Sequence, residues 1–190
     1  MNRKTWIAVG VQVAAMIWIL VPPALLARTG TTAYLETEKM DPRALFRGDY
    51  VILGYRQAQG IVPAEMAAQA ARERRPVYVT FTTDRPARFV AVGLERPAPA
   101  EGRVCIAGRP RISSPPRPPR PATSGPGAGP RTQPPPAEPL PVAVDFPAIA
   151  QYFVPEGEGR ALEEQRGEDL LARLAVNDRC QAVLLGLEPR

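Results

Sequence analysis

The chemistry open to this chain is limited by the residue types that it lacks. It contains no histidine, and its serines, Ser113, Ser114 and Ser124, all lie in a proline-rich segment. A serine or cysteine nucleophile activated by histidine is therefore excluded, and histidine-based metal sites are excluded with it. The reactive groups that remain are carboxylates, tyrosines, two cysteines and Lys39. We expect no cofactor and no bound metal ion.

Pairs of carboxylates are the main catalytic option that remains. Asp41 and Asp49 form one pair, and Glu156 and Glu158 form another. Either pair can supply a general acid and a general base. Acidic residues this close in sequence are also common in loops, so proximity alone assigns no reaction. A hydrolase that uses these carboxylates is the alternative to a protein that binds without catalysis.

The stretch DPRALFRGDYVILGY, residues 41–55, concentrates charged and aromatic residues. Gly48 permits positive φ and hence a sharp reversal into a strand. Asp49 can accept hydrogen bonds from nearby backbone N–H groups or pair with Arg43 or Arg47. Turn geometry therefore explains much of this polar cluster, and a docking surface for a partner is the other interpretation.

The second half of this stretch, residues 49–56, reads as a strand. Leu53 and Tyr55 would share one face with Val51, and Tyr50 would lie on the other face. Because both faces carry bulky side chains, we expect a central strand of a sheet.

The segment from Gly48 to Tyr55 resembles the motif of the GDYXXLXY family at every specified position. A second block, QYFVPEG at residues 151–157, resembles a downstream segment of the same family. The resemblance covers most of residues 31–188 apart from the proline-rich segment. It implies a membrane-anchored bacterial protein, encoded beside a polytopic membrane protein, with no reaction assigned. The motif and possible interface residues are Asp41, Arg43, Arg47, Gly48, Asp49, Tyr50, Leu53, Tyr55, Tyr152 and Glu156.

A weaker local similarity connects residues 40–51 with the signal peptidase box. Met40-Asp41-Pro42 followed by Gly48-Asp49 is similar to that box, but Lys39 stands where its nucleophilic serine would be. No lysine follows Lys39, so the base is missing as well. A non-catalytic relative of that fold remains an alternative.

An uncharged apolar segment occupies residues 6–27, with Gln12 as its one strongly polar residue. As a helix it would be about 33 Å long, enough to cross a bilayer. Arg3 and Lys4 precede it, which predicts a cytoplasmic N-terminus and a periplasmic or extracellular C-terminal domain at the bacterial inner membrane. Residues 1–28 are thus expected to be an uncleaved anchor. A signal peptide cleaved after Ala27 is the rival interpretation.

Export makes a disulfide possible between Cys105 and Cys180. Each cysteine lies in a strand-like run, 75 positions from the other, so pairing requires those runs to be adjacent. Two buried free thiols are the equal alternative.

The exported part is predicted to be one strand-dominated α+β domain formed by residues 29–107 and 142–190. A helix is expected over 63–74, with proline at its start and alanine throughout. The Asn177-Asp178 pair predicts a hairpin. Thirteen of the 24 prolines lie within 110–141, so residues 108–141 are expected to form a disordered insert. The predicted strands are 31–38, 49–56, 76–83, 88–94, 103–107 and two runs that flank Asn177-Asp178.

The formal net charge of +5 does not indicate a nucleic-acid binder. The excess arginine lies in the insert, which carries five arginines and one acid, and near the N-terminus. We therefore expect a membrane-anchored accessory protein that contacts the lipid bilayer through residues 6–27. Its partner would be a polytopic membrane protein.

Overall fold

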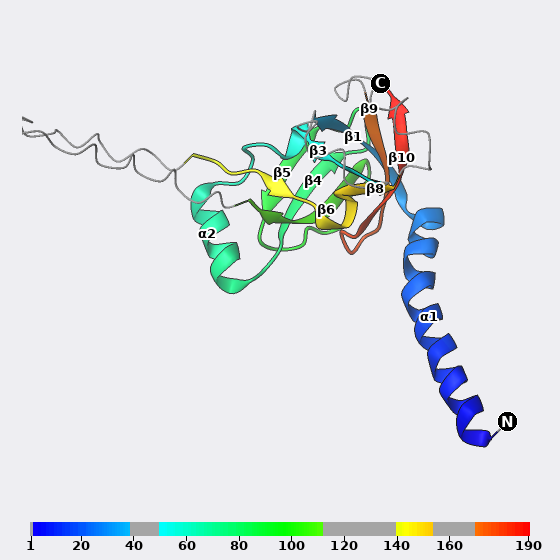
Figure 1. The fold of residues 1–190 in the computed structure, drawn as a ribbon. Helices are drawn as coiled ribbons and strands as arrows, with labels where there is room; N and C mark the ends of the chain where they lie inside the picture. Colours follow the sequence, from blue (N-terminus) through cyan, green and yellow to red (C-terminus); the bar gives the residue numbers. More distant parts are fainter. Residues whose placement is uncertain (1, 39–49, 112–139, 154–169) are drawn as a thin grey trace, which may run out of the picture.

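The structure is a computed structural model that describes residues 2–38, 50–111, 140–153 and 170–190. Figure 1 shows a strand-rich domain from which one long helix projects. The strand-dominated domain behind an N-terminal apolar helix that the sequence predicts is confirmed. The expected disordered insert lies largely outside the described residues.

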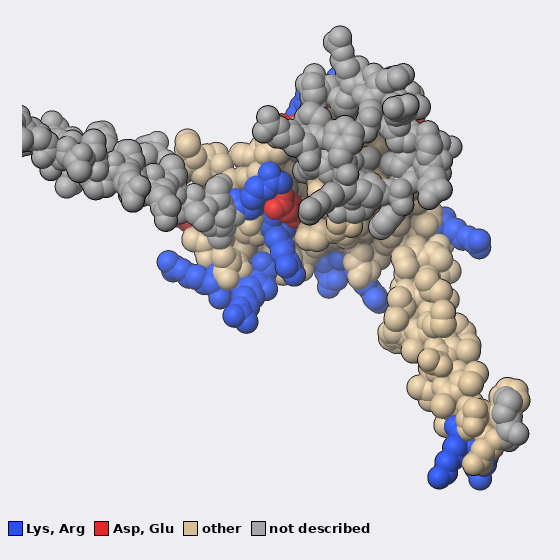
Figure 2. Space-filling view, viewed as in Figure 1, with Lys and Arg blue, Asp and Glu red and all other residues tan. Residues whose placement is uncertain are grey.

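Helix α1 (Arg3–Thr29) is long and apolar enough to cross a membrane. Its 27 residues would span about 40 Å. The helix continues through Pro22 and Pro23. In Figure 2 it is free of charged side chains between the basic residues near its N-terminus and the domain.

One antiparallel sheet has the order β10-β9-β1-β3. The strands are β1 (Thr31–Glu38), β3 (Gly54–Tyr55), β9 (Leu170–Val176) and β10 (Ala182–Pro189). β9 and β10 form the hairpin that the sequence predicts, and β1 pairs along the other side of β9. A single residue, Gly30, separates α1 from β1, so this sheet begins at the end of the helix.

The second sheet is also antiparallel, with the order β5-β4-β6-β7. The strands are β4 (Val77–Thr82), β5 (Phe89–Gly93), β6 (Arg103–Pro110) and β7 (Val144–Asp145). The alternation predicted for β4 is confirmed, because Val77, Val79 and Phe81 are fully buried. β6 continues to Pro110, beyond the expected end at Ala107, because its last residues pair with β7.

Short helices connect these sheets. η2 (Arg56–Ala58) follows β3, and α2 (Ala64–Glu73) confirms the predicted helix. Ala67 and Ala70 lie on the face of α2 that packs against the core, and both are buried. The helix ends at Arg74 in the left-handed conformation, with φ 52°, where its N–H caps the last turn.

The single central strand predicted over 49–56 is wrong. The chain forms two short strands, β2 (Tyr50–Ile52) and β3, with Leu53 between them. β2 pairs only with β8 (Gln151–Phe153), whereas β3 lies at the edge of the first sheet beside β1. The change of partner depends on a segment about a hundred residues away, which local periodicity does not reveal.

The core lies between the two sheets and joins them into one domain. Phe146, just after β7, contacts Phe81 and Tyr55 edge to face, with ring centroids 6.2 and 6.0 Å apart. Beside it, a Cβ added to Gly108 would meet the side chains of Val144 and Phe146 at less than contact distance. The 3-10 helix η3 (Pro147–Ile149) then buries Ile149 in the same cluster.

Candidate functional site

Four of the residues predicted to form a motif or interface lie in the described structure: Tyr50, Leu53, Tyr55 and Tyr152. The structure describes the backbone of Tyr50 but not its side-chain environment. The charged candidates, together with Lys39 and Glu158, lie outside the described residues. The predicted motif or interface residues outside the described structure are thus five charged residues and one glycine: Asp41, Arg43, Arg47, Asp49, Glu156 and Gly48.

The two sequence blocks that carry the motif form one two-stranded ribbon. β2 and β8 are antiparallel, with Tyr50 opposite Phe153 and Val51 opposite Tyr152. We call this pair the motif ribbon. Tyr152 is half-buried and packs against the main core. The structure therefore brings together residues 50–52 and 151–153, which belong to the two blocks that the sequence singled out separately.

Tyr55 ends the motif and anchors the ribbon to the core. Its side chain is 4% exposed, and its hydroxyl donates a hydrogen bond to the carbonyl oxygen of Ile149 at 2.6 Å. Burial raises the pKa of the Tyr55 phenol far above its ordinary value. Tyr55 is therefore a neutral hydrogen-bond donor, and neither its environment nor its geometry suits it to act as a base.

Leu53 makes a second connection to the same segment. Its backbone N–H donates to the carbonyl oxygen of Ala150 at 2.8 Å, and its side chain is 9% exposed in the core. Leu53 and Tyr55 thus hold two consecutive carbonyl groups, those of Ile149 and Ala150, immediately before β8. Their contribution is to position the ribbon.

A disulfide joins Cys105 to Cys180, which decides between the two alternatives for these cysteines. The Cα atoms are 4.7 Å apart, and the bond connects β6 of one sheet to the β9–β10 loop of the other. The backbone N–H of Ala107 also donates to the carbonyl oxygen of Cys180 at 2.9 Å. The two sheets are thereby linked covalently at the end where α1 joins the domain.

Asn177 organises the loop that presents Cys180. Its side-chain Oδ1 accepts hydrogen bonds from the backbone N–H groups of Arg179 and Gln181, each at 3.0 Å. The carbonyl of Asn177 accepts a third bond from the N–H of Cys180. These bonds hold Cys180 at φ 59°, in the left-handed region that side chains other than glycine seldom adopt.

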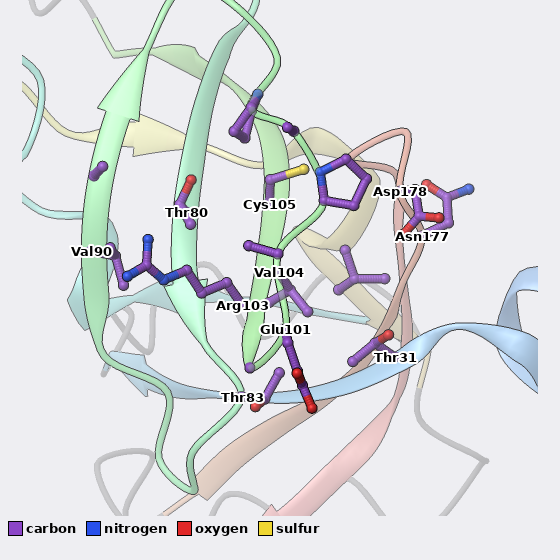
Figure 3. Close-up of a pocket in the computed structure, with 17 residues that line it drawn as sticks. Thr31, Thr80, Thr83, Val90, Glu101, Arg103, Val104, Cys105, Asn177 and Asp178 are labelled. Carbon is purple, nitrogen blue, oxygen red and sulfur yellow. The ribbon is translucent and has the colours of Figure 1, made fainter.

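A hollow of about 420 Å³ lies beside the disulfide. Figure 3 shows Arg103 reaching toward Val90, while Asn177 and Asp178 lie on the other side of the hollow. Threonine hydroxyls and Glu101 add polar groups to its wall. The hollow can accept a small polar group, and its described wall contains no serine, lysine or free thiol that could act as a nucleophile. Sequence reasoning missed it, because its residues come from separate segments.

The described residues, with their gaps at 39–49, 112–139 and 154–169, contain no cluster of three or more metal-ligating side chains. Several exposed carboxylates, such as those of Glu73 and Asp84, form ion pairs with arginines close in sequence. Asp84 accepts two hydrogen bonds from Arg88, and this contact lowers the pKa of the Asp84 carboxyl. Such exposed pairs stabilise the surface little and indicate no chemistry.

The sequence profile of the GDYXXLXY protein family matches residues 12–187. The chain belongs to the GDYXXLXY family. The match begins inside α1 and ends in β10, so it includes both strands of the motif ribbon. Comparison with curated proteins and with solved structures gave no match.

The specified positions of the GDYXXLXY motif fall into two groups, those buried in the described core and those that precede the motif ribbon. Leu53 and the final Tyr55 are core residues that fix the ribbon to residues 149–150. Gly48 and Asp49 precede the ribbon and lie outside the described residues. Because Tyr50 pairs with Phe153, the segments that carry Asp49 and Glu156 join the described fold at adjacent residues.

Proposed function

We propose that this GDYXXLXY protein is a single-pass, membrane-anchored accessory protein whose exported domain binds a polytopic membrane protein. The observation that carries the proposal is the junction of α1 with the domain. Leu26 in the last turns of α1 is 8% exposed, and the end of the helix contacts β9 and β10. A domain attached in this way stays at the membrane surface, where membrane proteins are its nearest targets.

The junction also favours an uncleaved anchor over a signal peptide. Cleavage after Ala27 would remove Leu26, which the domain covers. A Cβ on Gly30 would lie 2.8 Å from the carbonyl oxygen of Leu26 and 2.9 Å from the backbone N of Val176. The end of α1 is therefore packed closely against β9, which favours a helix that stays part of the folded protein.

The orientation follows from charge and redox chemistry. Arg3 and Lys4 precede the apolar segment, which favours a cytoplasmic N-terminus. The Cys105–Cys180 disulfide favours an oxidising compartment for the domain. Both observations support a domain on the periplasmic or extracellular side of a bacterial inner membrane. Figure 2 also shows basic side chains on the side of the domain from which α1 leaves.

The motif ribbon is the proposed centre of the binding surface. Leu53 and Tyr55 use their hydrogen-bonding groups inside the fold, so they are positioning residues. The polar residues available for a partner are those of the adjoining segments, above all Arg43, Arg47 and Asp49. The pairing of Tyr50 with Phe153, the described residues nearest to Asp49 and Glu156 in the sequence, favours one alternative, an exported hydrolase that uses carboxylates.

Co-purification and crosslinking from native membranes test the proposal. The wild type is compared with Asp49→Ala and with a control, Asp84→Ala, whose carboxylate forms an exposed ion pair with its neighbour Arg88. We expect one polytopic membrane protein to co-purify with the wild type and the control, and to be lost from Asp49→Ala. Equal resistance of all three proteins to limited proteolysis shows that the domain has folded in each variant.

Two results would contradict the proposal. If the wild type enriches no membrane protein above background, the accessory function has no support. If the partner binds Asp49→Ala normally while hydrolysis of an envelope substrate is lost, the carboxylate hydrolase is the better description.

A further inference from the structure

One polar side chain interrupts the apolar surface of α1. Gln12 lies near the middle of the helix, its side chain is exposed, and no described residue makes a hydrogen bond with it. Within a bilayer, water is not available to the amide group, and an unsatisfied amide in hydrocarbon is costly. A neighbouring helix that supplies a donor or an acceptor would remove this cost.

The residues around Gln12 permit such a helix to come close. Ala8 and Ala15 lie one turn before and after Gln12 on the same face, and Ile19 continues that face. Small side chains beside a polar one allow two helix backbones to approach within hydrogen-bonding reach. The opposite face carries Ile17 and Val21, both exposed. We call the face formed by Ala8, Gln12, Ala15 and Ile19 the Gln12 face.

The Gln12 face lies beneath the domain. Leu26, which the domain buries, follows Gln12 by about four helical turns, so both lie on the same side of α1. Figure 1 shows the domain displaced to one side of the helix axis. A helix that packs on the Gln12 face is therefore covered by the domain.

We propose that the Gln12 face is the intramembrane contact for a transmembrane helix of the polytopic partner, with the Gln12 amide hydrogen-bonded to that helix. This inference rests on the proposed accessory function and adds the partner's position. The overhang argues against a second copy of the chain. In a two-fold dimer through the Gln12 face, each domain would extend over the opposite helix and occupy the space of the other domain. A partner with short external loops fits beneath the domain without this conflict.

Site-specific photocrosslinking in native membranes tests the inference with the full chain. The photoreactive residue replaces Ile19 on the Gln12 face or, as a matched control, Ile17 on the opposite face, which are 69% and 55% exposed. We expect an adduct from position 19 only, with the attachment point in a transmembrane helix of a protein whose sequence has several spans. In the position-19 background, Gln12→Leu should lower the adduct yield about three- to tenfold, and Gln12→Asn should restore part of it.

Three outcomes would overturn the inference: equal adducts at both positions, an adduct between two copies of this chain, or no protein adduct at position 19. Its failure can be distinguished from failure of the proposed function. If the Asp49-dependent partner still co-purifies while position 19 forms no adduct with it, the accessory function stands and the Gln12 contact is wrong. If no partner co-purifies either, both are wrong.

Discussion

Replacing Tyr55 with phenylalanine isolates one hydrogen bond of the family motif. The hydroxyl is buried and donates to the Ile149 carbonyl at 2.6 Å, so its removal leaves that carbonyl without this donor. The ring and its packing against Phe146 are retained. Loss of such a bond, with a buried acceptor left behind, costs about 1–2 kcal/mol of unfolding free energy.

Urea unfolding of the full-length protein in detergent measures this cost. Trp6 and Trp18 both lie in α1, so pulse proteolysis reports on the domain better than tryptophan fluorescence does. The midpoint should fall by about 0.5–1 M urea for Tyr55→Phe. The control is Tyr78→Phe, a half-buried tyrosine of β4 for which the described structure gives no hydroxyl hydrogen bond, and it should stay near the wild type.

The pH dependence gives a second, independent readout of the same group. Burial raises the pKa of Tyr55 in the folded state above its unfolded value of about 10. Its neutral form therefore contributes stability below that value, and the contribution decreases as the pH rises further. The stability difference between wild type and Tyr55→Phe should narrow above about pH 10. Equal midpoints for Tyr55→Phe and Tyr78→Phe at neutral pH would refute the role assigned to the Tyr55 hydroxyl.

Three further changes should lower the stability of the domain. Reducing the Cys105–Cys180 bond, or replacing both cysteines with alanine, should cost about 2–4 kcal/mol in urea unfolding, and a reductant should not affect the double variant. Gly108→Ala should cost about 1–3 kcal/mol of unfolding free energy because its Cβ would overlap packed side chains. Gly186→Ala should cost much less, because the space at that position is open. Similar melting temperatures for the two variants would contradict this packing argument. Asn177→Ala should cost about 1–2 kcal/mol of unfolding free energy. It should also speed hydrogen exchange at the two loop amides whose N–H groups donate hydrogen bonds to Asn177 Oδ1. Unchanged exchange at both amides would exclude this role.

Sequence patterns predicted the elements whose structure depends on residues that are close to one another in the sequence. The alternation through Val77, Val79 and Phe81 indicated β4 correctly, because side chains of a strand alternate between its faces. Proline at the start and alanine throughout indicated α2 within a residue at each end. Asn177 marked the hairpin, because its short side chain can bond to the loop backbone.

The parts that sequence reasoning missed depend on distant partners. Residues 49–56 were predicted to be one central strand. Instead, the N–H of Leu53 donates a hydrogen bond to the carbonyl oxygen of Ala150, and at this point the chain changes its pairing partner from β8 to β1. β7, η3 and β8 have only two or three residues each, too few for a periodic signal. The pairing of Cys105 with Cys180 stayed open at the sequence level because it depends on how the two sheets pack.

The candidate site was predicted in part. The sequence motif singled out Tyr55 and Tyr152, and the structure pairs residues 50–52 with 151–153, a contact that the sequence did not predict. Their roles were not apparent, since the acceptor of the Tyr55 hydroxyl is a backbone carbonyl and carries no side-chain signature. The charged motif residues remain predictions because they lie outside the described residues.

The one-residue connection between α1 and β1 also determines how the domain would search for its target. With Gly30 packed against Val176 and Leu26 covered, the domain has no flexible tether on which to tumble. In a membrane, its encounters would be confined to a thin layer and to rotation about the bilayer normal. A target in the same bilayer would then meet it by two-dimensional diffusion in a nearly fixed orientation, at a high effective concentration. A weak contact surface would suffice for a membrane-embedded target, whereas a freely diffusing one would need a stronger surface.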